Sequence, residues 1–406
     1  MTQSHYDIII IGSGIVGATT ALALAKNPTL KIALLEANPV SADWNASQYD
    51  YRVSAISLAS KKILQHNSVW NAITKKRISS YLQMTVWDEA GRGQLHFDCA
   101  KINEATLGYI VEDSVIRTSL LEKVQDSSSI DFMQPIKLIS LTNSSDCVEL
   151  VTSENKKLTT KLVIAADGAN SWVRAQTNIE LKTWDYEQTA IVATVKTEFP
   201  HDATARQRFL STGPLAFLPL SDSHTCSIVW SAEHSYAEEL LQLNDDEFCQ
   251  RLSFAFENKL GKINHASTRY HFPLRMRHAK NYVQARIALI GDAAHTIHPL
   301  AGQGVNLGLL DAATLVEVIE EAIQKRRDFS SLATLRRYER WRKTDNLTML
   351  ATVDVLKHLF IKQNQTVQTF RNVGLSLTNS LMPLKNFFMN YAVGKRGDLP
   401  RMACRQ

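Results

Sequence analysis

The sequence predicts an α/β protein in which a sheet-rich segment interrupts a domain built from strands and helices. Residues 6–37 read as an apolar strand, a helix of small residues and a second apolar strand. Residues 180–232 alternate polar and apolar side chains, which is typical of strands in an antiparallel sheet. From Ser330 onward the chain has the periodicity of amphipathic helices. Because 406 residues exceed the usual size of one hydrophobic core, we expect more than one domain.

Composition and charge exclude several classes of protein. Hydrophobic residues at 45% and charged residues at 21% are ordinary for a globular chain and exclude disorder. The net charge of +5 is spread along the sequence, and the basic runs at 325–327 and 336–337 are typical of solvated helix faces. We therefore expect no nucleic-acid partner.

Cysteine usage and the apolar N-terminal segment bear on the compartment. The 5 cysteines lie far apart and form no C-x-x-C pair, which indicates a reducing environment and no structural zinc. Residues 8–25 are mostly apolar, but no basic segment precedes them and glycines interrupt them, unlike a targeting sequence. These features predict a cytoplasmic protein.

The glycines of residues 6–37 predict a nucleotide site. Gly12, Gly14 and Gly17 fit G-x-G-x-x-G between strand and helix, where they allow a tight turn, a close approach to a pyrophosphate and helix–strand packing. Glu36 follows about 20 residues on, where a carboxylate accepts hydrogen bonds from a ribose. Its negative charge disfavours a 2′-phosphate, so the tightly bound dinucleotide is FAD or NAD and not NADP.

Two later segments repeat the pattern of a strand running into a glycine turn. They are "KLVIAADGANSWVR" (161–174) and "RIALIGDAAH" (286–295), and the second is followed by an amphipathic helix at 304–325. The predicted boundaries place the cofactor domain at 1–75, 100–180 and 270–330, the substrate domain at 76–99 and 181–269, and a helical C-terminal region at 331–406.

These three motifs, in this order, resemble those of the single-component flavoprotein aromatic hydroxylases, and the resemblance covers nearly the whole chain. Segments 51–60, 107–124, 184–209 and 213–222 are similar to the ubiquinone-biosynthesis hydroxylases, and most similar to the branch that hydroxylates C5 of a polyprenylphenol. The resemblance implies a Rossmann-like FAD domain with an inserted substrate domain. It does not by itself decide the ring position, and sister enzymes that act at C6 or C1 remain alternatives.

The resemblance also implies which residues hold FAD. The glycine loop and Glu36 would bind the ADP half, Arg52 and Arg117 the pyrophosphate and ribityl region, and Asp292 the ribityl hydroxyls. Asp167 would position both FAD and the nicotinamide donor. The residues expected along the isoalloxazine are Pro299, Gly302, Gly304, Val305 and Asn306. A helix that begins near Gly304 would point its positive end at the flavin and stabilise negative charge there.

The reaction implied by the resemblance is hydroxylation of a phenol by O2 through a flavin C4a-hydroperoxide, in a site that excludes water. The chain has no second glycine fingerprint, so NADPH or NADH would bind only transiently as electron donor. A flavin-dependent oxidase or reductase, and a non-enzymatic component of a ubiquinone-biosynthesis complex, are the alternatives. Neither a catalytic base nor an oligomeric state follows from the sequence.

The stretch around Asp292, His295 and His298 also has the spacing of a two-histidine, one-carboxylate iron site. Such a site needs three converging side chains, whereas this segment is a strand end followed by a loop rich in proline and glycine. We therefore expect no metal. Both histidines are expected to orient the loop by hydrogen bonds, and His298 is the one candidate for contact with substrate.

Two further parts of the sequence are candidates for contact with substrate or with a surface. Segment 213–220 with the aromatic residues Phe209, Phe217 and Trp230 is expected either to line the substrate site or to form ordinary core. Residues 381–396 are apolar with basic neighbours, and such a segment can contact a membrane surface, a partner subunit or the protein's own body.

Overall fold

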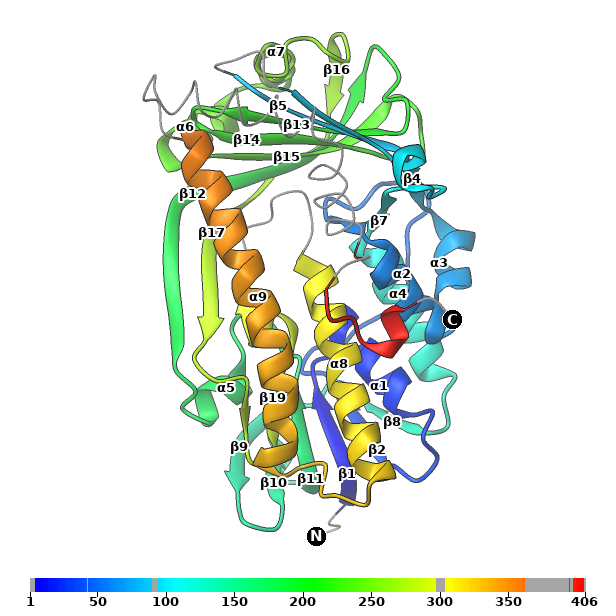
Figure 1. Cartoon of the computed structure of the whole chain (residues 1–406). Helices are drawn as coiled ribbons and strands as arrows, with labels where there is room; N and C mark the ends of the chain where they lie inside the picture. Colours follow the sequence, from blue (N-terminus) through cyan, green and yellow to red (C-terminus); the bar gives the residue numbers. More distant parts are fainter. Residues whose placement is uncertain are drawn as a thin grey trace.

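The computed structural model describes residues 4–41, 43–89, 94–296, 304–361, 394 and 397–404, and of residues 348–361 it describes only the backbone. His298, Pro299, Gly302 and most of segment 381–396 therefore lie outside the described residues. The described part confirms an α/β protein in which two large sheets lie at opposite ends of the molecule (Figure 1).

The first large sheet is mixed, with a parallel centre. Its main path runs β18-β19-β11-β1-β2-β8, and β10 and β9 extend it antiparallel from β11. The inner strand β1 is buried at Ile8, Ile9 and Ile10, as a parallel strand covered on both faces must be. The bounds are β1 Ser4–Ile11, β2 Ile32–Leu35, β8 Ile130–Met133, β9 Leu138–Asn143, β10 Val148–Thr152, β11 Lys157–Ala165, β18 Val283–Gln284 and β19 Ile287–Leu289.

Helices cover this sheet. The first helix, α1 (Ile15–Leu24), is almost entirely buried and packs against α4 (Asp113–Gln125) and α8 (Gly304–Gln324). The long helix α9 (Leu332–Ile361) runs beside α8 from β18 toward the second large sheet (Figure 1). The shorter helical segments are α2 Leu58–His66, α3 Trp70–Lys76, α5 Trp172–Gln176, η1 Cys99–Ile102, η2 Gly291–Ala293 and η3 Arg401–Ala403.

A small antiparallel sheet lies between the two large ones. Its strands are β3 (Val53–Ile56), β7 (Gly108–Glu112) and β4 (Ser79–Tyr81), in the order β3-β7-β4. Gly108 is required where β7 passes β4, because a Cβ there would lie 2.8 Å from the Tyr81 hydroxyl and 2.8 Å from the Ile56 carbonyl oxygen. This sheet joins the cofactor-domain helices to the second large sheet.

The second large sheet has nine strands in the described residues and is mostly antiparallel. Its order is β20-β17-β12-β15-β14-β13-β5-β6, with β16 also paired to β12. One face packs on α6 (His234–Gln242) and α7 (Asp245–Ala255) around Trp230 and Phe217. The bounds are β5 Gln83–Asp88, β6 Gln94–Asp98, β12 Leu181–Thr197, β13 Thr204–Leu210, β14 Gly213–Pro219, β15 Thr225–Glu233, β16 Ile263–Ala266, β17 Tyr270–Ala279 and β20 His295–Thr296.

Sheet membership differs from the predicted domain boundaries at two places. Strand β17 (270–279) pairs with β12 and belongs to the second large sheet, although residue 270 was expected to begin the last cofactor-domain segment. Strand β4 (79–81) pairs with β7 in the small sheet, although 76–99 was expected in the substrate domain. In both cases sheet membership depends on pairing with a strand that is distant in sequence, which local periodicity does not show.

Two further observations concern the whole described chain. All five cysteines are free. Within the residues whose structure is described, we find no helix with the length and apolar character needed to span a bilayer.

Candidate functional site

The glycine loop between β1 and α1 has the shape of a phosphate-binding turn. Gly12 has φ of 101°, and a Cβ at Gly17 would lie 1.9 Å from the Gly12 carbonyl oxygen, so both positions require glycine. A Cβ at Gly14, by contrast, would meet no atom within 4 Å. Gly14 is also the N-cap of α1 and has no side-chain capping bond. The first N–H groups of α1 therefore face open space in which an anion can bind.

Glu36 is held beside this loop. Its Oε2 accepts hydrogen bonds from the Ser13 backbone N (2.9 Å) and the Ser13 hydroxyl (3.0 Å). Its Oε1 accepts from the Asn38 backbone N at 3.1 Å. A carboxylate at the end of β2, fixed next to the glycine turn, is well placed for ribose hydroxyls.

The second motif turns at Asp167 and Gly168, directly after β11. Oδ2 of Asp167 accepts from the Val173 backbone N at 3.1 Å, whereas Oδ1 is buried without a hydrogen-bond partner among the described residues. Burial raises the pKa of Asp167, although bonds from Ser171 and from backbone N–H groups oppose the rise. Asp167 thus caps α5 with one oxygen and leaves the other free for a donor.

Two arginines join the second motif to its neighbours, and the sequence reasoning gave neither of them a role. Arg174 donates to the Ala293 carbonyl oxygen at 2.9 Å and to the Ala169 carbonyl oxygen at 2.8 Å. Arg277, on β17, also donates to the Ala169 carbonyl oxygen, at 3.0 Å. Arg174 ends the quoted motif, which was the available signal, whereas nothing in the sequence singles out Arg277.

Asp292 lies where the third motif leaves β19, and its side chain is exposed. Neighbouring protein atoms partly desolvate its carboxyl group, which raises the pKa of Asp292. The charges of His295, Arg52 and Arg277 oppose part of that rise. The exposed Arg52 precedes β3 and also acts on the pKa of Asp113, the first residue of α4, which burial raises. Asp292 and Arg52 therefore lie close enough for their charges to interact.

Arg117 is placed less directly. It lies on α4 one helical turn beyond Asp113, and its side chain is exposed. No hydrogen bond joins its guanidinium to another described residue. Arg117 is thus on the helix whose start lies beside Arg52, with a charge that is free to bind a ligand.

In the first turn of α8, the side chain of Asn306 hydrogen-bonds the protein backbone, a role that the sequence did not suggest. Its Oδ1 accepts from the Ser57 backbone N at 2.9 Å, and its Nδ2 donates to the Ala55 carbonyl oxygen at 2.7 Å. The side chain is therefore taken up in fixing α8 to β3 and α2, and contact with a flavin is left to the backbone. Gly304 and Val305, half-buried in the same turn, carry no such bond, and a Cβ at Gly304 would meet no atom within 4 Å.

His295 has the orienting role expected for it. Its Nε2 lies 2.5 Å from Oδ2 of Asp311, a fully buried residue of α8 that also accepts from the Gly291 backbone N at 3.1 Å. Arg342 of α9 donates to the other oxygen of Asp311 at 2.9 Å. Burial by itself would raise the pKa of Asp311, but His295 and Arg342 together hold it below its usual value. In the sequence, Asp311 stands among apolar residues of the predicted helix, and this was the available signal for the network. Nothing in the sequence singles out Arg342.

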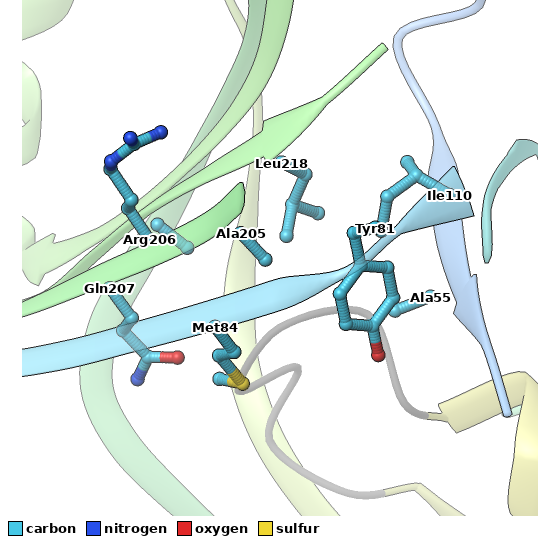
Figure 2. Close-up of a pocket in the computed structure, with 9 residues that line it drawn as sticks. Ala55, Tyr81, Met84, Ile110, Ala205, Arg206, Gln207 and Leu218 are labelled. Carbon is cyan, nitrogen blue, oxygen red and sulfur yellow. The ribbon is translucent and has the colours of Figure 1, made fainter. Parts of the chain in front are cut away.

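A pocket lies between the small sheet and the second large sheet (Figure 2). Its apolar lining consists of Ala55, Met84, Ile110, Ala205, Ala216 and Leu218. Three polar residues, Tyr81, Arg206 and Gln207, also border it. Because Ala55 is the residue whose carbonyl oxygen receives Asn306, the pocket adjoins the start of α8. Part of the predicted segment 213–220 thus lines a cavity.

The aromatic residues expected near substrate lie elsewhere. Phe217 and Trp230 are buried on the opposite face of the sheet, beneath α6 and α7. Phe209 packs against Val86 and Leu95. Strand alternation explains the difference, because Ala216 and Leu218 face the pocket while Phe217 between them faces away.

Comparisons with known proteins show the family to which the chain belongs. Residues 5–347 match the FAD binding domain family. The ubiquinone biosynthesis monooxygenase COQ6 of Rattus norvegicus is 36% identical, over 96% of this chain and 91% of its own. The 3-demethoxyubiquinol 3-hydroxylase of Escherichia coli (strain K12) is 35% identical, over 97% of this chain and 100% of its own. Among solved structures, p-nitrophenol 4-monooxygenase PnpA from Pseudomonas putida DLL-E4 superposes with a TM-score of 0.78 at 17% identity, covering 98% of this chain and 100% of that one.

The fold and these matches define an FAD-dependent monooxygenase. Within that class, the chain belongs to the family of ubiquinone-biosynthesis FAD hydroxylases. The open space at Gly14, the placement of Glu36 and the spare oxygen of Asp167 fit a bound FAD.

Proposed function

We propose that this chain hydroxylates the aromatic ring of a polyprenylphenol in ubiquinone biosynthesis, at C5, with O2 as the oxygen source. The observation that carries the proposal is the apolar pocket, which shares Ala55 with the anchor of α8 and so adjoins the expected position of the flavin. The names of the two relatives support a ubiquinone precursor as substrate.

Each part of the site has a task in this proposal. FAD, when bound, would supply the activation of O2 and the delivery of one oxygen atom. The glycine loop, Glu36 and the Arg52–Asp292 pair would hold the nucleotide and its ribityl chain, and Arg117 and Asp167 would assist them. The N-terminus of α8 would stabilise negative charge beside Gly304 and Val305. The pocket would orient the phenol and exclude water.

Several finer features belong to the same proposal. NADPH or NADH would reduce the enzyme in a transient complex. The division into an FAD domain, a substrate domain and a C-terminal helical region would separate cofactor binding from substrate choice. The protein would act in the cytoplasm, at the membrane surface where a polyprenyl tail resides, alone or in a ubiquinone-biosynthesis complex.

Hydroxylation at another ring position, C6 or C1, is the second candidate. It is favoured by the E. coli relative, which is 35% identical and whose name gives hydroxylation at position 3 of a demethoxyubiquinol. The two candidates differ in the intermediate that a cell accumulates when the protein is removed.

The test is therefore to delete the protein from a quinone-producing host and identify the accumulated intermediate by mass spectrometry and NMR. A polyprenylphenol that lacks only the C5 oxygen supports the proposal, and one that lacks the C6 or C1 oxygen replaces it with the second candidate. Incorporation of ¹⁸O from labelled O2 separates a monooxygenase from an oxidase or reductase. Complementation with Asp292→Ala should fail and flavin content should fall, whereas Asp146→Ala, in the β9–β10 turn, should complement fully.

A further inference from the structure

Gln207 is a buried amide that faces the pocket. It lies on β13, and only 6% of the residue is exposed. Its cross-strand neighbours are Val86 on β5 and Ala216 on β14, so no polar side chain lies beside it in the sheet. No hydrogen bond joins its side chain to any other described residue. Figure 2 shows Gln207 extending from β13 to the opposite side from Arg206.

An unpartnered amide in this position points to a ligand. Neither atom of this amide is among the fully buried, unsatisfied polar atoms of the described residues, so the amide is open to the pocket and available to a ligand there. Gln188, a buried glutamine on β12, differs, because its Nε2 donates to the Thr212 carbonyl oxygen at 3.4 Å and its Oε1 is fully buried without a partner among the described residues. Gln207 has no such bond, and the remaining lining of its pocket is mainly apolar.

The other polar groups of the pocket restrict what the ligand can be. Arg206 is turned away, and its guanidinium donates to the His201 carbonyl oxygen at 2.7 Å. Burial raises the pKa of Tyr81 to about 12, so its hydroxyl stays protonated at neutral pH. With no free cation in the described lining, the pocket suits a neutral ring that carries an oxygen substituent and does not suit a benzoate.

We infer that Gln207 is a specificity residue that hydrogen-bonds the hydroxyl oxygen of a neutral phenol in this pocket. The inference rests on the proposed function and identifies the group that hydrogen-bonds the hydroxyl substituent of the ring. The amide can both donate to that oxygen and accept its proton, whereas the apolar lining contacts the ring faces.

The test measures binding to the holoenzyme from the change in flavin absorbance. The probes are 2-geranylphenol, which has a short prenyl tail, and geranylbenzene, which lacks the oxygen. The unmodified holoenzyme should bind the phenol about tenfold more tightly or better, as expected for one hydrogen bond in a buried site. Gln207→Met is close in size, and it should remove most of that preference by weakening the phenol alone.

The melting temperature gives a second readout. If Gln207 had only a structural role, its replacement would lower the melting temperature. Because Gln207 makes no hydrogen bond to another described residue and Gln207→Met matches the mainly apolar lining, the variant should melt at the same or a higher temperature than the unmodified protein. Gln207→Leu provides a second apolar variant. Gln83→Leu is the matched control, because Gln83 lies on neighbouring β5 but does not line the pocket, and it should keep the phenol preference.

The outcomes separate this inference from the proposed function. If the unmodified holoenzyme prefers the phenol and both Gln207 variants keep the same preference, Gln207 is not the specificity residue. Only this inference is then overturned. An unmodified holoenzyme that binds both probes equally also overturns it. An unmodified holoenzyme that binds neither probe overturns the prenylphenol assignment together with the role of Gln207.

Discussion

Replacing Arg342 by methionine should destabilise the protein strongly, because it breaks a fully buried ion pair. Arg342 is 1% exposed and donates to Asp311 (2.9 Å), Asp345 (3.0 Å) and Asn346 (2.8 Å). Without it, the fully buried carboxylate of Asp311 keeps the Gly291 N–H and His295 but loses the guanidinium. Leaving a buried charge unpaired in this way costs about 3–5 kcal/mol.

That cost is large compared with the stability of folded proteins, which is roughly 5–15 kcal/mol. For a chain of this length we expect a fall in melting temperature of about 4–6 °C. FAD affinity should fall as well, because Asp311 anchors Gly291 and His295 on either side of Asp292. Thermal unfolding of the apoprotein and holoprotein, followed by circular dichroism, and flavin titration measure both effects.

Arg337→Met is the matched control on the same helix. Arg337 bonds Glu321 at 2.8 Å, but its side chain is 39% exposed, and exposed pairs contribute about 0–1 kcal/mol. The reasoning is refuted if Arg342→Met loses no more stability than Arg337→Met, or if it unfolds more easily yet binds FAD as tightly as the unmodified protein.

Three other changes test the site. Asp292→Asn should lower FAD affinity, measured by flavin fluorescence, about tenfold or more, because it removes the carboxylate that is expected to accept the ribityl hydroxyls. Gly108→Ala should cost about 1–3 kcal/mol in urea unfolding and weaken 2-geranylphenol binding, because its methyl group must displace the Tyr81 ring. Since the folded pKa of Asp311 is lowered, its stabilising contribution is complete above pH ~4 and is lost as the pH falls further. Arg342→Met should therefore make the free energy of unfolding less dependent on pH below about pH 4, with the contribution of His295 retained.

The parts of the fold that follow from sequence are those specified by local pattern. Glycines at 12 and 17 are dictated by backbone contacts within one β-α-β unit, so their positions predict the turn directly. The alternation in residues 180–232 likewise predicts β12 and β15, although both strands are buried on both faces over much of their length. Such features need no knowledge of distant residues.

The parts that could not be predicted depend on partners far apart in the chain. Asp311 and Arg342 pair between two helices, and Arg174 reaches Ala293 more than a hundred residues away. The assignment of Phe217 to core and of its neighbours Ala216 and Leu218 to the pocket depends on which sheet face the helices α6 and α7 cover. Local sequence gives the alternation, but only the tertiary structure decides which side is the cavity.

One strand, β3, and one helix, α8, fix the position of the cofactor region relative to the pocket. Ala55 of β3 contributes its side chain to the pocket and its carbonyl oxygen to Asn306, while Asp311 fixes the middle of α8 to Gly291 and His295. Because these bonds are buried, the distance from α8 to the pocket does not depend on exposed residues. The small side chain of Ala55 leaves little between the start of α8 and a ring in the pocket. The residues that set this distance are therefore different from Gln207, which faces the same pocket from β13, so substrate preference can change without moving the cofactor region.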